Sequence, residues 1–301
     1  MTRNCNFDCP FCYYHDGKNT CSSGDLSLSV VKNIFKELPM LAGVIVGLEG
    51  EPLLYNNLPG FMELAETHSR AITIITNGGP LTEKVCRDWA NFSIKNIILS
   101  VDAADRLSYE RFRKNGGFER FKKNAAMVAG MLPCQFHATV FKENLKSLLG
   151  MPALAYDLGI KRLSLQLLRS HPGSMARHIR SASRAELSRW LPEMRANAAQ
   201  YNIDLGFDRN FGDLVWESDQ IDAASIKHTT GNGTHCEHAD TLACVLSDGR
   251  LFPCAGDFEP VPIKEYSFDG MFNHPYLLAL RALRGAGRLI EPCRICMNIE
   301  H

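Results

Sequence analysis

Residues 96–102 read NIILSVD, and this short stretch decides the fold class. Side chains alternate between the two faces of a strand, so Ile98, Ser100 and Asp102 share one face while the apolar residues at 97, 99 and 101 share the other. Ligands of parallel α/β folds bind at the carboxyl ends of the strands, where Ser100 and Asp102 lie. The pattern predicts a parallel strand with helices on its apolar side and a polar ligand on the other. The alternative for Ser100 and Asp102 is a helix-capping or turn role.

The same alternation recurs on two later segments. His137 and Thr139 alternate with apolar residues at 135–141, and Ser164 and Gln166 do so at 162–168. We expect His137 and Thr139 either to line a pocket or to form a satisfied buried polar pair. Ser164 and Gln166 are expected to face a barrel interior that holds a polar ligand.

Strand and helix patterns alternate along the first 200 residues. Strands are expected at 43–48, 71–77, 96–102, 135–141 and 162–168, with residues 1–4 as a short first strand. Helices are expected at 26–38, 60–69, 82–90, 107–132 (broken at Gly116 and Gly117), 145–158 and 185–200. This order predicts an α/β fold with six βα units, a partial (β/α)6 TIM-like barrel.

The rhythm changes after residue 201, where turn-rich sequence and cysteines predominate. We expect a barrel over residues 1–201 and a small cysteine-rich domain over 202–301, with strand-like pieces at 202–207 and 251–254.

The eleven cysteines fall mainly into two groups. The first is Cys5, Cys9 and Cys12, and the second is Cys236, Cys244, Cys254, Cys293 and Cys296. Disulfides are rare in reducing compartments, where clustered thiols more often bind metal, so two metal sites are predicted. Cys86 and Cys134 are expected to be small core residues.

The first group has the spacing CxxxCxxC. Three thiolates on one loop can hold three corners of a four-iron cluster and leave the fourth iron open. The alternative is zinc, which requires a fourth ligand that only His15 or Cys21 offers nearby.

Four motifs in order carry a family resemblance: CNFDCPFC at 5–12, EGEP at 49–52, TNG at 76–78 and LSVD at 99–102. Over residues 1 to about 200 the chain resembles the radical S-adenosylmethionine (SAM) enzymes. The resemblance implies that SAM chelates the open iron through its amino and carboxylate groups. An electron from the [4Fe-4S] cluster then cleaves SAM to a 5′-deoxyadenosyl radical, which abstracts hydrogen from an unactivated carbon.

The resemblance also implies a set of SAM contacts: Phe11, Gly50, Glu51, Asn77, Ser100 and Asp102. Glu51 is expected beside the methionine amino group, and Gly50 allows a close backbone approach. Phe11 is expected near the adenine, and Ser100 or Asp102 near the ribose or carboxylate.

The C-terminal region is similar to the twitch form of the SPASM auxiliary-cluster domain. The match consists of Cys236, Gly249, Cys254 and the CRIC motif at Cys293 and Cys296. It implies a second [4Fe-4S] cluster on these four thiolates; a zinc ribbon with four cysteine ligands is the alternative.

Cys244 has no place in that spacing. It is an alternative ligand, a small buried hydrophobe, or a catalytic hydrogen-atom donor that returns hydrogen to the face of a substrate opposite the radical.

The resemblance favours a small-molecule substrate, a sugar or aminocyclitol of the kind found in antibiotic biosynthesis, and we lean to epimerisation with Cys244 as donor. A motif that starts at residue 5 leaves no room before it for a leader-binding module, which disfavours a peptide. Three alternatives stay open: a dehydrogenase that uses the second cluster as electron acceptor, a peptide-modifying enzyme, and a non-enzymatic electron carrier.

Charge and hydropathy indicate which partners to expect. The chain has 33 basic and 33 acidic residues, so neither nucleic acid nor a membrane surface is expected as a partner. No apolar run approaches the roughly 18 residues of a membrane span, and a cytoplasmic protein is expected. A flavodoxin- or ferredoxin-type protein is the expected reducing partner.

Overall fold

Six parallel strands form one sheet in the order of the chain. They are β1 (Gly43–Val46), β2 (Ala71–Thr76), β3 (Ile94–Ser100), β4 (Cys134–Val140), β5 (Arg162–Leu167) and β6 (Asp204–Phe207). The computed structural model describes residues 1–12, 24–168, 179–208, 211, 213–216, 242–252, 262, 266–286 and 288.

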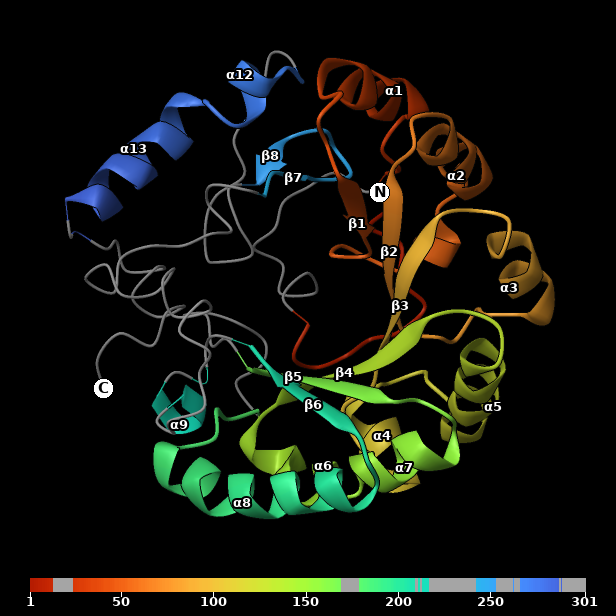
Figure 1. Ribbon diagram of the computed structural model, residues 1–301, viewed down its shortest axis with the longest axis vertical. Helices are drawn as coiled ribbons and strands as arrows, with labels where there is room; N and C mark the ends of the chain where they lie inside the picture. The colour runs from red at the N-terminus through yellow and green to blue at the C-terminus, as the bar shows by residue number, and fades with distance from the viewer. Residues whose placement is uncertain are drawn as a thin grey trace.

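Helices connect the strands and cover one face of the sheet. They are α1 (Leu28–Glu37), α2 (Leu58–Thr67), α3 (Glu83–Trp89), α4 (Arg106–Phe112), α5 (Phe118–Ala129), α6 (Leu145–Leu148), α7 (Met151–Asp157) and α8 (Arg184–Gln200). Figure 1 shows these helices as an outer arc with the strands inside it. The architecture is an α/β partial barrel, as the alternation in the sequence predicts.

Strand burial follows the two-residue period. Ile97, Leu99 and Phe136 are fully buried on the face toward the helices, as are their counterparts on β5. Ser100 and His137 alternate with them and stay partly exposed on the inner face. The barrel therefore has an apolar outer layer and a polar, accessible lumen.

Several helix boundaries have local causes that the sequence shows. The break at Gly116 and Gly117 is confirmed, since α4 ends before it and α5 begins after it. The single helix expected at 145–158 is wrong: it divides into α6 and α7, with Gly150 at the N-cap of α7 and Pro152 in its first turn. Proline has no N–H to donate to the preceding turn, so a helix starts there more readily than it continues.

The expected first strand at residues 1–4 is wrong. This segment forms only an isolated antiparallel bridge between Thr2 and Asp25. Its backbone is engaged elsewhere, because the N–H of Glu51 donates to the carbonyl of Asn4 at 2.8 Å. Four residues held against the loop after β1 leave too little chain for a ladder.

The strand expected at 202–207 is confirmed, but its assignment to the C-terminal domain is wrong. β6 pairs in parallel with β5, in the register Arg162↔Asp204 to Leu165↔Phe207, and so completes the six-stranded sheet. Helix α8 before it makes the long crossover that a parallel strand requires. The division of the chain into two domains otherwise stays a prediction.

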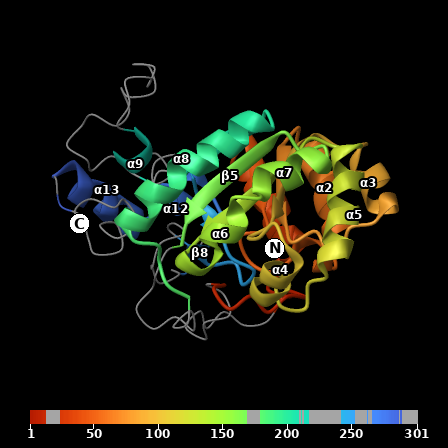
Figure 2. The same ribbon diagram turned by 90° about the horizontal axis from the view of Figure 1, so that it is seen from below.

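The C-terminal part contributes a hairpin of β7 (Cys244–Val245) and β8 (Leu251–Phe252), followed by α12 (Phe268–Met271) and α13 (Pro275–Gly285). Figure 1 shows this hairpin beside β1, and Figure 2 shows α13 at the end of the molecule away from α3 and α5. In the segments that the structure describes, no helix has the length and apolar character to span a membrane.

Candidate functional site

The cysteine loop lies against the carboxyl ends of the strands. Cys9 is buried, whereas Cys5 and Cys12 are partly exposed. The N–H of Cys12 donates to the carbonyl of Cys9 at 3.0 Å, which closes a tight turn between the last two cysteines.

Gly50 fixes the position of this loop. It has a φ of +61°, and a Cβ there would lie 2.5 Å from the carbonyl oxygen of Thr2 and 2.7 Å from that of Asn4. Only glycine adopts this conformation at such close range without strain. Gly50 therefore lets this loop approach the chain's own N-terminal segment directly before Cys5, and its contact with SAM stays a prediction.

Glu51 is almost fully buried, at 1% exposure, and its carboxylate accepts bonds from within the chain. Oε1 accepts from the Thr76 hydroxyl at 2.7 Å and from the Leu53 N–H at 3.2 Å, and Oε2 accepts from the Asn77 N–H at 2.8 Å. Burial raises the pKa of Glu51, and these donors oppose the rise. Glu51 thus ties its loop to the end of β2, and its contact with SAM stays a prediction.

Asn77 connects the end of β2 to the cysteine loop. Its Nδ2 donates to Asn6 Oδ1 at 2.9 Å and lies 3.9 Å from Cys5 Sγ, while its Oδ1 accepts from the Gly79 N–H at 2.8 Å. This side chain supplies an N–H directed at a cysteine sulfur.

Asp102 and Arg113 form a buried ion pair beside Cys9. Asp102 Oδ2 lies 2.5 Å from Arg113 Nε, and the two side chains are 1% and 12% exposed. Asp102 Oδ1 accepts from the Thr139 N–H at 2.7 Å. Both carboxylate oxygens of Asp102 are therefore engaged within the chain, and Asp102 orients Arg113. The hydroxyl of Ser100 is more available to a ligand than the Asp102 carboxylate.

Arg113 reaches the cysteine loop at two points. Its Nη1 lies 3.9 Å from Cys9 Sγ, and its guanidinium stands 5.6 Å from the centre of the Phe11 ring. Phe11 also contacts Phe141, with ring centres 5.2 Å apart. The guanidinium of Arg113, which Asp102 fixes in place, thus contacts both Cys9 and Phe11 of the loop.

A row of polar residues crosses the lumen from β3 to β5. The strand register pairs Ser100 with His137 and His137 with Ser164, so the three side chains lie at one level. His137 Nδ1 lies 3.4 Å from Ser164 Oγ. No hydrogen bond to the Ser100 hydroxyl occurs within the described residues, so this row retains donors and acceptors for a ligand.

The His137 ring is enclosed by the barrel wall but keeps part of its surface accessible. Burial lowers its pKa, an effect opposed by Asp102 and by the Gln166 side chain. The imidazole is therefore neutral near pH 7, with one nitrogen to donate and one to accept.

A protein-family model matches residues 1–152, and its description is the Radical SAM superfamily. The chain belongs to the radical SAM superfamily. Members of this superfamily use a [4Fe-4S] cluster and SAM, and the matched residues contain all four motifs read from the sequence.

Similar proteins and solved structures cover nearly the whole chain. The AdoMet-dependent heme synthase of Methanosarcina barkeri (strain Fusaro / DSM 804) is 24% identical over 316 residues, covering 98% of this chain and 86% of the relative. The structure of native anSMEcpe with bound AdoMet and Cp18Cys peptide matches with a TM-score of 0.70 at 15% identity, covering 98% of this chain and 85% of that one. Streptococcus suis SuiB bound to precursor peptide SuiA matches with a TM-score of 0.65 at 16% identity, covering 84% of this chain but only 57% of SuiB.

The chemistry of the loop fits the radical SAM cluster. Two N–H donors, from Asn77 and Arg113, approach cysteine sulfurs, and such bonds help to set the potential of iron–sulfur clusters. Burial raises the pKa of the Cys9 thiol to about 12, which Arg113 opposes, so metal binding displaces a proton. Cys5, Cys9 and Cys12 would hold three irons.

A mononuclear zinc site is the weaker interpretation. Over the described ranges, no three Cys, His, Asp or Glu side chains converge as the ligands of one ion would. Thiolates of a four-iron cluster bind different irons, so the three cysteines need not converge on one point. The other zinc candidates, His15 and Cys21, lie outside the described residues.

The second cysteine group is only partly within the described chain. Cys236, Cys254, Cys293 and Cys296 lie outside it, so the second cluster stays a prediction. Cys244 is buried in β7, with 7% exposure, and burial raises the pKa of its thiol to about 11. Its neighbours Ala243 and Val245 contact the apolar cluster around Leu38, from which Cys244 is absent.

Sequence reasoning missed two residues of this site, Arg113 and Asn6. Arg113 lies after α4 and reaches the site only because that short helix folds back over the end of β3. Asn6 lies inside the CNFDCPFC motif, and its position between two predicted cluster ligands could have indicated that it belongs to the site.

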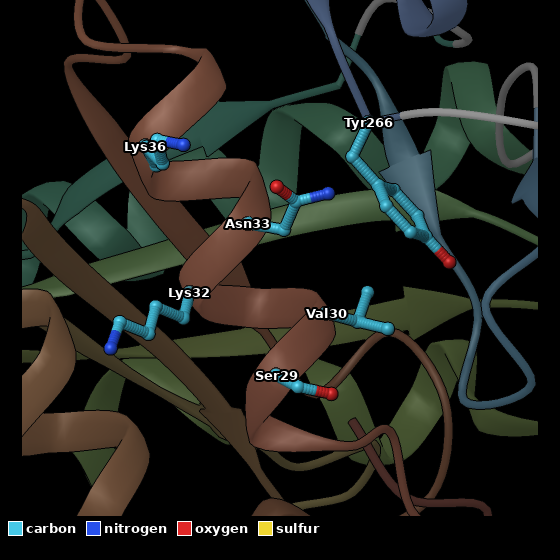
Figure 3. Close-up of a pocket in the computed structure, with 6 residues that line it drawn as sticks. All are labelled: Ser29, Val30, Lys32, Asn33, Lys36 and Tyr266. Atoms are coloured by element: carbon cyan, nitrogen blue, oxygen red, sulfur yellow. The ribbon is translucent and has the colours of Figure 1, made fainter.

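A separate cavity of about 410 Å³ lies between α1 and Tyr266. Figure 3 shows Tyr266 facing the helix, with Val30 and Asn33 on the opposite side. None of the predicted site residues lines it, so this cavity is separate from the cluster loop and the lumen.

Proposed function

We propose that this radical SAM enzyme abstracts a hydrogen atom from a carbon of a polar substrate bound in the barrel lumen. The observation that carries the proposal is the polar row of Ser100, His137 and Ser164, which lies at one level of the barrel lumen. When bound, the cluster and SAM supply a carbon radical that removes hydrogen.

The lumen residues favour a substrate that both donates and accepts hydrogen bonds. A neutral His137 and two hydroxyls carry no net charge and supply both kinds of partner. Hydroxyl and amino groups of a sugar or aminocyclitol fit this set. The side chains of Leu99, Phe136 and Leu165 are fully buried between the sheet and the helices, and they hold the strands that carry this polar row in place.

We infer that the reaction is an epimerisation with Cys244 as the second partner. The substrate carbon loses a hydrogen atom on one face and gains one from the Cys244 thiol on the other, which leaves a sulfur radical. That radical regains one electron from the flavodoxin- or ferredoxin-type reductant and one proton from solvent. A buried thiol with a pKa of about 11 keeps its S–H near neutral pH, as a hydrogen donor must.

Peptide modification is the second candidate. It is favoured by the similarity over 98% of the chain to anSMEcpe, whose structure contains a peptide. The same lumen residues would then bind the backbone or a side chain of the peptide. A dehydrogenase outcome, with the second cluster accepting the substrate's electron, is the remaining enzymatic alternative.

The test is anaerobic incubation of the reduced enzyme with SAM in deuterated water, using a panel of aminocyclitols and a panel of short peptides. Epimerisation predicts one deuterium at an inverted carbon, whereas a dehydrogenase gives a product lighter by two mass units. Turnover of peptides alone overturns the sugar-type substrate.

Cys244→Ala isolates the second step. The variant should still cleave SAM and abstract hydrogen from the substrate, but it should fail to invert the carbon. Cys134→Ala is the matched control, because burial also raises the pKa of that thiol to about 11 and it lies at the amino end of β4. Undiminished inversion in Cys244→Ala contradicts the donor role.

A further inference from the structure

A buried carboxyl group joins the SAM motif to the C-terminal hairpin. Glu49 and Ser247 are 5% and 4% exposed, and the N–H of Ser247 donates to Glu49 Oε2 at 2.7 Å across 198 residues of sequence. Ser247 lies in the turn between β7 and β8, which Figure 1 shows beside β1.

The contact between Glu49 and Ser247 leaves two buried polar atoms without hydrogen bonds to the residues that the structure describes, which is unusual for a contact that serves only stability. Glu49 Oε1 and Ser247 Oγ are both buried, and neither has a hydrogen-bond partner within the described chain. A buried polar atom without a partner costs free energy, and apolar residues of similar size would hold such an interface more cheaply. The value of Glu49 therefore lies in where it places the hairpin.

The residues after Glu49 extend the contact to the first cluster loop. Gly50 packs on the backbone at Thr2 and Asn4, and the N–H of Glu51 donates to the Asn4 carbonyl at 2.8 Å. Glu51 also holds the Asn77 N–H, and the Asn77 side chain lies 3.9 Å from Cys5 Sγ. An unbroken series of contacts thus runs from the hairpin turn to a predicted cluster ligand.

We propose that Glu49 is a positioning residue that couples the C-terminal hairpin to the cluster loop and SAM motif. The hairpin lies between Cys236 and Cys254, so Glu49 sets the position of the segment that carries Cys244. This inference rests on the proposed function, but hydrogen exchange and SAM affinity test it without a substrate.

The experiment compares Glu49→Ala, Glu49→Gln and Ser247→Ala with the wild-type full chain. Glutamine keeps an oxygen for the Ser247 N–H and should preserve the contact, and Ser247→Ala removes only an unpartnered hydroxyl. The matched control is Glu66→Ala. Glu66 lies away from the site, and its carboxylate accepts a hydrogen bond of 2.9 Å from the Ser93 N–H.

Hydrogen exchange of the anaerobically reconstituted full chain, without substrate, is the first readout. In Glu49→Ala the amides of residues 244–252 should exchange about tenfold faster or more, while those of β3 and β4 stay protected. Equal exchange in wild type and Glu49→Ala overturns the proposal.

The affinity for SAM of the anaerobically reconstituted enzyme is the second readout. The Kd should rise about tenfold in Glu49→Ala at unchanged iron content and return to near the wild-type value in Glu49→Gln. A purely structural role loosens the hairpin but leaves the Kd unchanged, and that result also overturns the coupling. Failure of the wild type to cleave SAM counts against the proposed function and leaves the exchange result standing.

Discussion

Breaking the Asp102–Arg113 pair tests how the cluster loop is held. The two side chains are 1% and 12% exposed, so removal of either leaves the other as an unpaired buried charge. Burial lowers the pKa of Arg113, but Asp102 and Cys9 outweigh this and the net shift is upward, so the guanidinium stays charged. Loss of one partner of such a pair costs about 3–5 kcal/mol.

The perturbations are Asp102→Asn and Arg113→Met, each alone and together. At about 2–4 °C per kcal/mol for a unit of this size, each single change should lower the Tm by about 6–20 °C. The double variant leaves no buried charge, and the new amide can still accept from the Thr139 N–H, so it should cost at least about 1 kcal/mol less than the sum.

Thermal unfolding under anaerobic conditions, followed by far-UV circular dichroism, measures these shifts in the full chain. Arg106→Met is the matched control, because Arg106 pairs with Glu110 on an exposed helix face at 3.2 Å and should shift the Tm by less than about 3 °C. Single variants that unfold within about 2 °C of the wild type, or shifts that add without coupling, would refute the reasoning.

Three further predictions follow from the site. Gly50→Ala should lower the free energy of unfolding by about 1–3 kcal/mol and reduce the iron bound on reconstitution, because Gly50 has a φ of +61° and a Cβ there would clash with Thr2. Gly24→Ala, with nothing within 4 Å of its Cβ, should change neither quantity. Equal melting temperatures and iron contents in the two variants contradict this. Burial lowers the pKa of His137 from 6.5, so the unfolded chain takes up the proton first as the pH falls. Below pH 6.5 the wild type should therefore lose stability relative to His137→Asn by up to about 1.4 kcal/mol per pH unit, with no pH-dependent difference above pH 6.5. Parallel stability curves from denaturant titrations rule this out. Reconstituted wild type should bind about eight irons and Cys254→Ala about four, and about four in both would exclude the second cluster.

The barrel could be predicted from the sequence because its signals are local. The two-residue period of NIILSVD and its counterparts identifies the strands, and the glycines at 116 and 117 show where α4 gives way to α5. The segment at 202–207 was recognised as a strand for the same reason. Its partner was not, because pairing with β5 depends on how the long helix α8 returns the chain to the sheet.

The contacts that define the site were harder to predict because they join distant residues. The sequence identified Asp102 and Glu51 but not their partners, since Arg113 approaches Asp102 through the fold of α4 and Thr76 lies 25 residues from Glu51. The contact between Glu49 and Ser247 spans 198 residues and has no local pattern. Residue types at strand ends indicate a site, and only the packing shows which groups remain available to a ligand.

Cleavage of SAM by the reduced protein tests the central claim most directly. The wild-type chain, reconstituted anaerobically and reduced with dithionite, should convert SAM to 5′-deoxyadenosine and methionine, and Cys9→Ala should not. An intact [4Fe-4S] cluster on Cys5, Cys9 and Cys12 with no cleavage of SAM would contradict the account and favour an electron carrier instead.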